Sequence, residues 1–169
     1  MKLLSVALIA ISLISSAIQA NEASFEGLKN YQENGEKMVS SGLPNKHHFS
    51  QFKALGVAQV IDLIPGDRSD EIALMEKLNL NYHNIPVDWH NPTLDDFNQY
   101  AQLMTQYSAT EGKTLTHCKL NWRGAVFTYL YRITYLEHDD ATAKADMMAI
   151  WHPNETWQAF IDKVIQQYR

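Results

Sequence analysis

Short apolar runs alternate along the chain with longer segments in which apolar residues recur every three or four positions. The short runs are rich in valine, isoleucine and leucine and predict β-strands, whereas the three-to-four spacing predicts amphipathic helices. Strands are predicted over residues 37–40, 58–64, 80–87 and 113–118. Helices are predicted over residues 45–55, 71–78, 93–107, 124–137 and 140–151, with a last helix after residue 154.

Polar residues and turn formers mark the ends of these helices. Asp70, Thr93 and Asn154 are predicted N-caps, because their side chains can accept hydrogen bonds from free N–H groups of a first helical turn. Gly56 and Pro153 are predicted to end the helices before them. Two of the helices carry a continuous apolar stripe, at Phe97, Tyr100, Ala101, Met104 and Tyr107, and at Trp157, Phe160, Ile161, Val164 and Tyr168.

Strands that alternate with helices indicate a parallel sheet covered by helices on both faces. The predicted fold class is therefore α/β, with three layers and a mostly parallel central sheet flanked by helices. Ligands of such sheets bind beyond the carboxyl ends of the strands. The loop after the strand at 113–118 lies at that edge, and it becomes the first place to look for a site.

The first 20 residues have the pattern of a secretory signal peptide. Lys2 precedes an apolar run that closes with small residues, and Ala20 is the expected last residue before cleavage. The expected organisation is a signal peptide at 1–20 and one domain at 21–169. The mature chain is expected to be a soluble periplasmic or secreted protein with no stable membrane anchor.

Charge and cysteine content narrow the function classes further. The formal net charge is −5, and it becomes −6 without Lys2, the only charged residue of the first 20. This acidic balance argues against nucleic acid as a partner. The single cysteine, Cys118, cannot form an internal disulfide, so in an oxidising compartment it must be buried, paired between chains or used chemically.

The segment HCKLNWRG, residues 117–124, indicates how the cysteine is used. Cys118 ends a predicted strand just before a helix, whose unpaired N–H groups and dipole favour bound anions and a thiolate. Arg123 adds a planar fork for two oxyanion oxygens, and Lys119 adds positive charge. Cys118 is therefore expected to be an accessible nucleophile. His117 either orients the loop through a hydrogen bond or is simply a half-buried strand-end histidine.

The order of these elements resembles that in the cysteine-dependent protein tyrosine and dual-specificity phosphatases: a strand, His-Cys, a short loop, an arginine and a helix. Three further segments are similar to the bacterial phosphatase-like DUF442 branch of that superfamily: SSGLPNKHHFSQFKALGVAQVIDL, IPVDWHNPT, and HCKLNWR before a helix carrying YLYR. The similarity covers residues 38–136, so the last two helices contribute nothing to it. The resemblance implies a dual-specificity-phosphatase-like fold.

The resemblance also implies a mechanism and a set of site residues. Cys118 would attack phosphorus, Arg123 and loop amides would hold the phosphoryl oxygens, and Asp88 would protonate the leaving oxygen. Asp88 could instead be a solvated turn carboxylate. Asp95, Asp96 and His90 are weaker candidates for the acid. The expected partner is a phosphorylated substrate or a small oxyanion such as phosphate or sulfate, with no cofactor, and its expected binding residues are His117, Lys119, Leu120, Asn121, Trp122 and Gly124.

The loop departs from the superfamily signature at three points. Four residues rather than five separate Cys118 from Arg123, the loop contains no glycine, and Gly124 replaces the usual hydroxyl residue after the arginine. A six-residue loop that begins at cysteine is also found in rhodanese-type sulfurtransferases, which carry a persulfide. Two alternatives to a phosphatase therefore stay open: sulfurtransferase chemistry and an anion-binding module without catalysis.

The sequence indicates no metal centre. The chain's other histidines lack the spacing of metal ligands, so we expect structural or solvated side chains at His47, His48, His83, His90, His138 and His152. Arg68 could reach the rim of the site from the segment PGDRSDE, although a polar turn explains that segment equally well.

Overall fold

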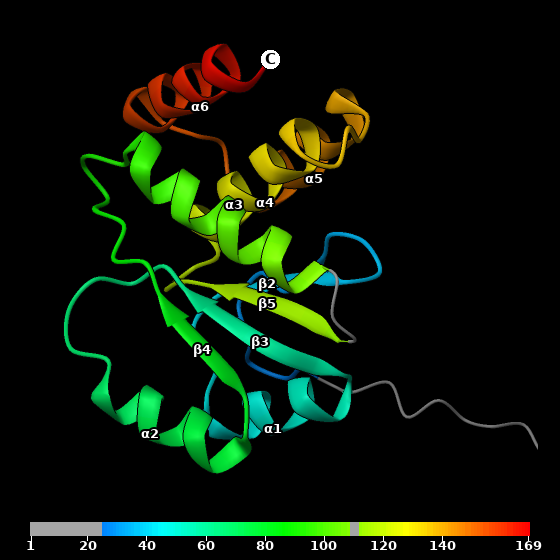
Figure 1. Cartoon of the computed structure of the whole chain (residues 1–169), viewed down its shortest axis with the longest axis vertical. Helices are drawn as coiled ribbons and strands as arrows, with labels where there is room; N and C mark the ends of the chain where they lie inside the picture. Colours follow the sequence, from blue (N-terminus) through cyan, green and yellow to red (C-terminus); the bar gives the residue numbers. More distant parts are fainter. Residues whose placement is uncertain (1–24, 109–111) are drawn as a thin grey trace, which may run out of the picture.

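A five-stranded sheet lies between two layers of helices in the computed structural model, which describes residues 25–108 and 112–169 (Figure 1). The expected signal peptide at 1–20 lies outside the described residues. Within the described ranges, every helix is too short or too polar to cross a bilayer.

The strand order is β1-β2-β5-β3-β4, and β5 lies at the centre. The strands β2, β5, β3 and β4 are mutually parallel, and only β1 runs antiparallel to its neighbour β2. Their bounds are Gln32–Glu33 (β1), Met38–Ser41 (β2), Val57–Asp62 (β3), Asn81–Asn84 (β4) and Lys113–His117 (β5). The predicted α/β class with a mostly parallel sheet is confirmed. The short polar strand β1 was not predicted.

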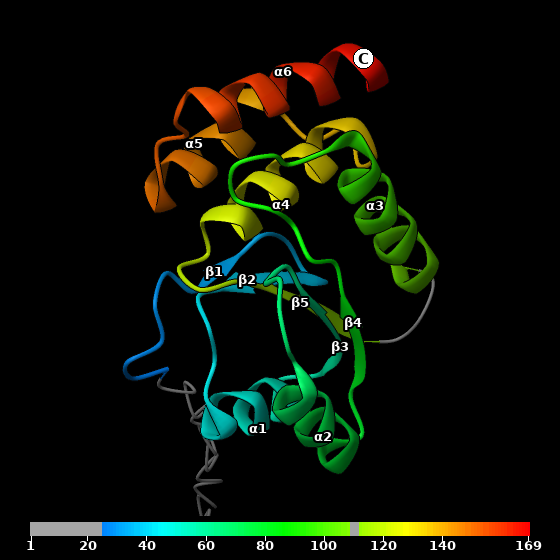
Figure 2. The same cartoon turned by 90° about the vertical axis from the view of Figure 1, so that its left-hand side faces the viewer.

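Six helices cover the sheet, with α1 and α2 on one face and α3 to α6 on the other (Figures 1 and 2). Asn45 and Asn154 cap α1 and α6 with their side chains, and Thr93 and Asp96 form a reciprocal pair at the start of α3. The bounds are Lys46–Ala54 (α1), Ser69–Leu78 (α2), Leu94–Ser108 (α3), Trp122–Thr134 (α4), Asp140–Ile150 (α5) and Glu155–Tyr168 (α6).

Several predicted boundaries are wrong: β3 ends at Asp62 instead of residue 64, and α4 ends at Thr134 instead of residue 137. Asp70 does not cap α2, because the helix already begins at Ser69, whose amide donates to the Asp67 side chain (2.9 Å). The strand β4 ends at Asn84 instead of residue 87. The helix α4 begins at Trp122 instead of residue 124, because Asn121 adopts a left-handed φ of 61° and turns the chain into the helix.

The two faces of the sheet bury two separate apolar clusters. The larger cluster lies under α3 to α6, and α4 is at its centre, with every residue from 123 to 133 buried. Leu115 points to the cluster under α1 and α2, whereas Cys118 belongs to the larger cluster. Successive side chains of a strand alternate between faces, so His117 shares the α1–α2 side with Leu115.

The carboxyl ends of the parallel strands bring polar residues into one row. His117 of β5 is in register with Ser41 of β2 and with Asp62 of β3, and Asp62 is in register with Asn84 of β4. The loops that follow β2, β3, β4 and β5 therefore leave the sheet at the same edge, which is the edge where the sequence predicted a site.

Candidate functional site: a cysteine–arginine loop

The loop after β5 is held by backbone hydrogen bonds from two other segments. The amide of Cys118 donates to the Ser41 carbonyl (3.3 Å), and the amide of Leu43 donates to the Lys119 carbonyl (3.2 Å). The Asn30 side chain donates to the Leu120 carbonyl (2.8 Å). Residue 30 is far away in sequence and carries no catalytic signature, so sequence reasoning missed it. These contacts fix the path of a loop that has no internal glycine.

Asn121 gives the short loop its turn. Asparagine is one of the few residues other than glycine that tolerate a left-handed φ, which Asn121 adopts at 61°. Its side-chain amide is fully buried and donates to the Ser40 hydroxyl (2.9 Å) and to the Asn30 carbonyl (2.7 Å). Asn121 therefore supplies the positive φ that a loop glycine would otherwise supply.

The same asparagine explains why glycine follows Arg123. A Cβ atom at Gly124 would lie 2.3 Å from the Asn121 Oδ1 atom, well inside van der Waals contact. The Asn121 amide cannot easily move away, because two hydrogen bonds hold its other end. The hydroxyl residue of the superfamily signature is thus incompatible with this arrangement of the loop.

The start of α4 presents donors for an anion. The first N–H groups of a helix have no acceptor within the helix, and no side chain caps α4. Arg123 lies in this first turn and is 9% exposed. Its Nε atom donates to the Val87 carbonyl (3.1 Å), while its two Nη atoms donate to none of the described residues. The amides and the remaining guanidinium nitrogens can together bind a tetrahedral oxyanion.

Arg123 also joins the loop to the segment between β4 and α3, which carries Asp88. Asp88 directly follows Val87, and the Arg123 guanidinium lies 5.4 Å from the ring centre of Trp89. Asp88 is exposed, and its carboxylate accepts the His90 amide (2.9 Å). The structure therefore places the segment that carries the candidate acid beside Arg123. It gives Asp96 a capping role and leaves Asp95 exposed in the first turn of α3.

Cys118 is buried rather than accessible, with 1% of its surface exposed. The expectation of an open thiol is wrong because the side chain points into the cluster under α4. Lys119 and Leu120 are exposed, and Trp122 is half-buried. Trp122 stacks on Trp151 of the segment after α5, with ring centres 5.3 Å apart.

His117 is completely buried and bonded to an acidic cluster on the α1–α2 side. Its Nε2 atom lies 2.7 Å from Glu71 Oε1, and its Nδ1 atom lies 3.8 Å from Asp62 Oδ1. Arg68 forms ion pairs with both carboxylates, each at 2.5 Å. Burial, together with the Asp62 carboxylate, raises the pKa of the neighbouring Tyr82 above its usual value. His117 is therefore held by a charge network that sequence reasoning did not find.

The ligand atoms of Asp62, Glu71 and His117 lie within 4.8 Å of one another, which is close enough to hold a metal ion. The Arg68 guanidinium already supplies the positive charge at this place, and a dication beside it would be repelled. We assign the cluster to the support of β5 and its loop.

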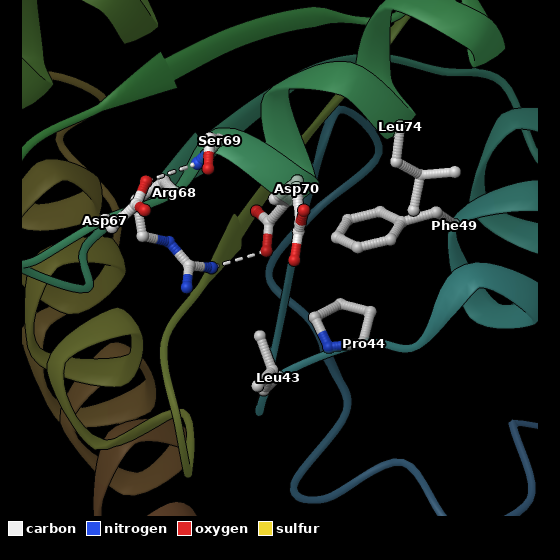
Figure 3. A pocket seen from close by; sticks show the side chains of 9 residues that line it. Leu43, Pro44, Phe49, Asp67, Arg68, Ser69, Asp70 and Leu74 are labelled. Atoms are coloured by element: carbon white, nitrogen blue, oxygen red, sulfur yellow. Dashed lines mark hydrogen bonds and ion pairs between the residues drawn. The ribbon is translucent and has the colours of Figure 1, made fainter.

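A pocket of about 310 Å³ opens beside the loop, at the start of α2 (Figure 3). Leu43 forms one wall and also donates its amide to the Lys119 carbonyl, so the pocket adjoins the loop. Three of its charged lining residues are acidic and one, Arg68, is basic. The pocket is lined by Leu43, Pro44, Phe49, Asp67, Arg68, Ser69, Asp70, Glu71 and Leu74.

The fold is that of the cysteine-dependent tyrosine and dual-specificity phosphatases, with a central strand, a cysteine loop and an arginine in the first turn of a buried helix. Solved structures share this fold. TpbA of Pseudomonas aeruginosa matches at 22% identity with a TM-score of 0.63, covering 82% of this chain and 88% of its own. The core catalytic domain of the PP-IP phosphatase SIW14 of S. cerevisiae matches at 14% identity with a TM-score of 0.68, covering 83% and 86%.

A solved structure with a higher sequence identity shows which family the chain belongs to. A candidate phosphatase of the DUF442 group from Shewanella putrefaciens is 31% identical, with a TM-score of 0.74, and the match covers 85% of this chain and 96% of that one. The chain belongs to the DUF442 family, as the sequence motifs indicated. No family model and no curated protein matches the chain.

Proposed function

We propose that this protein is an exported phosphatase-like hydrolase that cleaves a phosphate monoester. The observation that carries the proposal is the loop from Cys118 to Arg123, which places a cysteine, free helix N–H groups and a guanidinium beside the segment that bears Asp88. A TpbA variant has been solved with pTyr, and SIW14 with citrate, which supports an oxyanion ligand for this fold.

The chemistry has two steps. The Cys118 thiolate attacks phosphorus, the bond to the leaving oxygen breaks, and Asp88 donates its proton to that oxygen. Water then attacks the phosphocysteine, Asp88 takes the proton from water, and the Cys118 sulfur leaves as a thiolate. Arg123 and the amides at the start of α4 stabilise the phosphoryl oxygens in both steps. Because Cys118 is buried, the phosphate must enter the loop, whereas bulky thiol reagents should react slowly.

The first test is hydrolysis of aryl phosphates by the mature protein and three variants. Cys118→Ser should abolish turnover, and Arg123→Ala should reduce it by about 100-fold or more, since one oxyanion donor is worth roughly 2.7–4 kcal/mol. Arg123→Lys should also be slow, because an ammonium cannot form the bidentate fork. Turnover retained by Cys118→Ser would exclude the proposed nucleophile.

Asp88 is tested through the leaving group. Asp88→Asn should slow phenyl phosphate strongly and p-nitrophenyl phosphate less, because only a poor leaving group needs the proton. Asp95→Asn is the matched control, since Asp95 is exposed in the first turn of α3. An equal loss on both substrates would show that Asp88 is not the acid.

Mass spectrometry of Cys118 separates the two alternatives. A persulfide that forms with thiosulfate, without any phosphocysteine from aryl phosphate, would favour a sulfurtransferase. Phosphate binding without either adduct would favour a binding module.

Export is tested separately from catalysis. The periplasmic protein should begin at Asn21 if the signal peptide is cleaved after Ala20. N-terminal sequencing of the cell fractions checks this, and an uncleaved cytoplasmic protein would contradict it.

A further inference from the structure

The segment between β4 and α3 accepts hydrogen bonds at the residues on either side of Asp88. On one side, the Val87 carbonyl accepts the Arg123 Nε–H bond (3.1 Å). On the other side, the Trp89 carbonyl accepts the indole N–H of Trp157 (3.0 Å). Asp88 and Trp89 lie between these two carbonyls, so the backbone of this pair is held at both ends.

Trp157 is itself firmly held. It lies in the first turn of α6, is 0% exposed, and its amide donates to the N-cap Asn154 (3.1 Å). Its ring packs 5.2 Å from Trp89 and 5.6 Å from Phe160, measured between ring centres. Figure 2 shows the segment between β4 and α3 passing beneath α6. The indole ring offers one donor only, and that donor is used on the segment that carries Asp88.

The rest of α6 is docked through other residues. Phe160, Ile161 and Val164 are buried, and the Tyr168 hydroxyl donates to the Asn98 side chain of α3. These contacts fix α6 to α3 and α4 without the hydrogen bond from Trp157 to the Trp89 carbonyl. This separates the packing role of α6 from the specific hydrogen bond to Trp89.

We propose that Trp157 is a positioning residue, whose indole N–H holds the Trp89 carbonyl and so fixes the segment that carries Asp88 next to Arg123. This inference rests on the proposed function, in which Asp88 is the acid. It extends the catalytic unit to α6, a helix outside residues 38–136 that carry the sequence resemblance.

The test is Trp157→Phe, which keeps an aromatic ring and removes the donor. Turnover of phenyl phosphate should fall by about 10- to 100-fold, because a small displacement of a catalytic group has effects of that size. Turnover of p-nitrophenyl phosphate should change far less. The variant Asp88→Asn/Trp157→Phe should be no slower than Asp88→Asn alone. Equal slowing of both substrates, or additive losses in the double variant, would overturn the proposal.

Tyr168→Phe is the matched control. It also removes one hydrogen bond made by α6, but that bond goes to α3 and not to the segment that carries Asp88. It should leave the ratio of the two turnover rates unchanged. A Tyr168→Phe variant with the same leaving-group dependence as Trp157→Phe would mean that general loosening of α6 is responsible.

Amide hydrogen exchange tests the inference without turnover. The amides of His90 and Asn91 both donate to Asp88, at 2.9 and 3.3 Å, so they should exchange faster in Trp157→Phe and not in Tyr168→Phe. If the wild type hydrolyses no phosphate ester, the proposed function fails, and unchanged exchange would still overturn the role of Trp157. If Trp157→Phe does not fold, 3-benzothienylalanine at position 157 keeps the ring size and lacks the donor.

Discussion

The pairing of Asn121 with Gly124 is the residue-scale feature that shapes this loop. Asn121 adopts the left-handed turn, and its Oδ1 atom occupies the space where any other residue at 124 would place its Cβ. The two departures from the superfamily pattern, an absent loop glycine and an absent hydroxyl, are therefore one structural solution.

Gly124→Ala should destabilise the protein, although alanine normally favours a helix by about 1 kcal/mol. Overpacking against Asn121 costs about 1–3 kcal/mol and outweighs that gain. Urea unfolding measures the loss. In the double variant Asn121→Gly/Gly124→Ala the clash is absent, so its loss of stability should be smaller than the sum of the two single losses. Additive losses would contradict the pairing.

His83 should make stability depend on pH. Burial lowers its pKa, and its Nε2 atom has no hydrogen-bond partner among the described residues. The unfolded chain then binds more protons below about pH 6.5, so the free energy of unfolding should fall as the pH drops from there through the lowered pKa. His83→Gln should remove this contribution. Urea unfolding between pH 8 and 5 checks it, and a constant difference between the two proteins would contradict it.

At the scale of elements, the loop is held by β2 and by the segment before it. The buried Ser40 hydroxyl accepts the side-chain amides of Asn34 and of Asn121, both at 2.9 Å. One hydroxyl on β2 thus joins the start of the described chain to the loop between Cys118 and Arg123.

Ser40→Ala should lower the free energy of unfolding by about 1–3 kcal/mol, because two buried donors each lose an acceptor. It should also weaken phosphate binding, since Asn121 loses part of its support. Ser50→Ala is the control: Ser50 is exposed on α1, and its loss should stay within about 0.5 kcal/mol. Equal effects of the two substitutions would contradict the role of Ser40.

The elements with strong periodicity were predictable from sequence, and the contacts that shape the site were not. The apolar stripe from Phe97 to Met104 and the unbroken apolar run after Gly124 predicted α3 and α4. The side chains that hold the site, Asn30 and Ser40 at the loop and Trp157 at the segment before α3, come from distant segments, where nothing in the local pattern marks this role. The strand β1 has two half-buried or exposed polar residues, so it offered no apolar signal.

At the scale of the whole molecule, the other three tryptophans gather around Trp89, which lies against Arg123. Trp89 lies 5.7, 5.2 and 5.2 Å from Trp122, Trp151 and Trp157, measured between ring centres. They come from the segment before α3, from α4 and from the two C-terminal helices with their linker, so the cluster unites the helical layer around the site.

Phosphate binding should therefore change the intrinsic fluorescence of the protein. Arg123 contacts the face of Trp89, and an anion on its guanidinium alters that contact. A titration with inorganic phosphate should give a saturable signal in the wild type and in Cys118→Ser, and none in Arg123→Ala. Lys77→Ala, which removes an exposed charge from α2 on the other face of the sheet, should behave like the wild type. A signal retained by Arg123→Ala would place the anion elsewhere.

The hydrogen bonds between Asn30 and the loop have a consequence for the order of folding. The two hydrogen bonds of Asn30 connect residues that lie 90 and 91 positions apart in sequence. The hydrogen bond between Trp157 and Trp89 connects residues that lie 68 positions apart. Contacts at such separations form late, because the chain between them must first lose its freedom. Refolding should therefore restore phosphate binding only in its slowest phase.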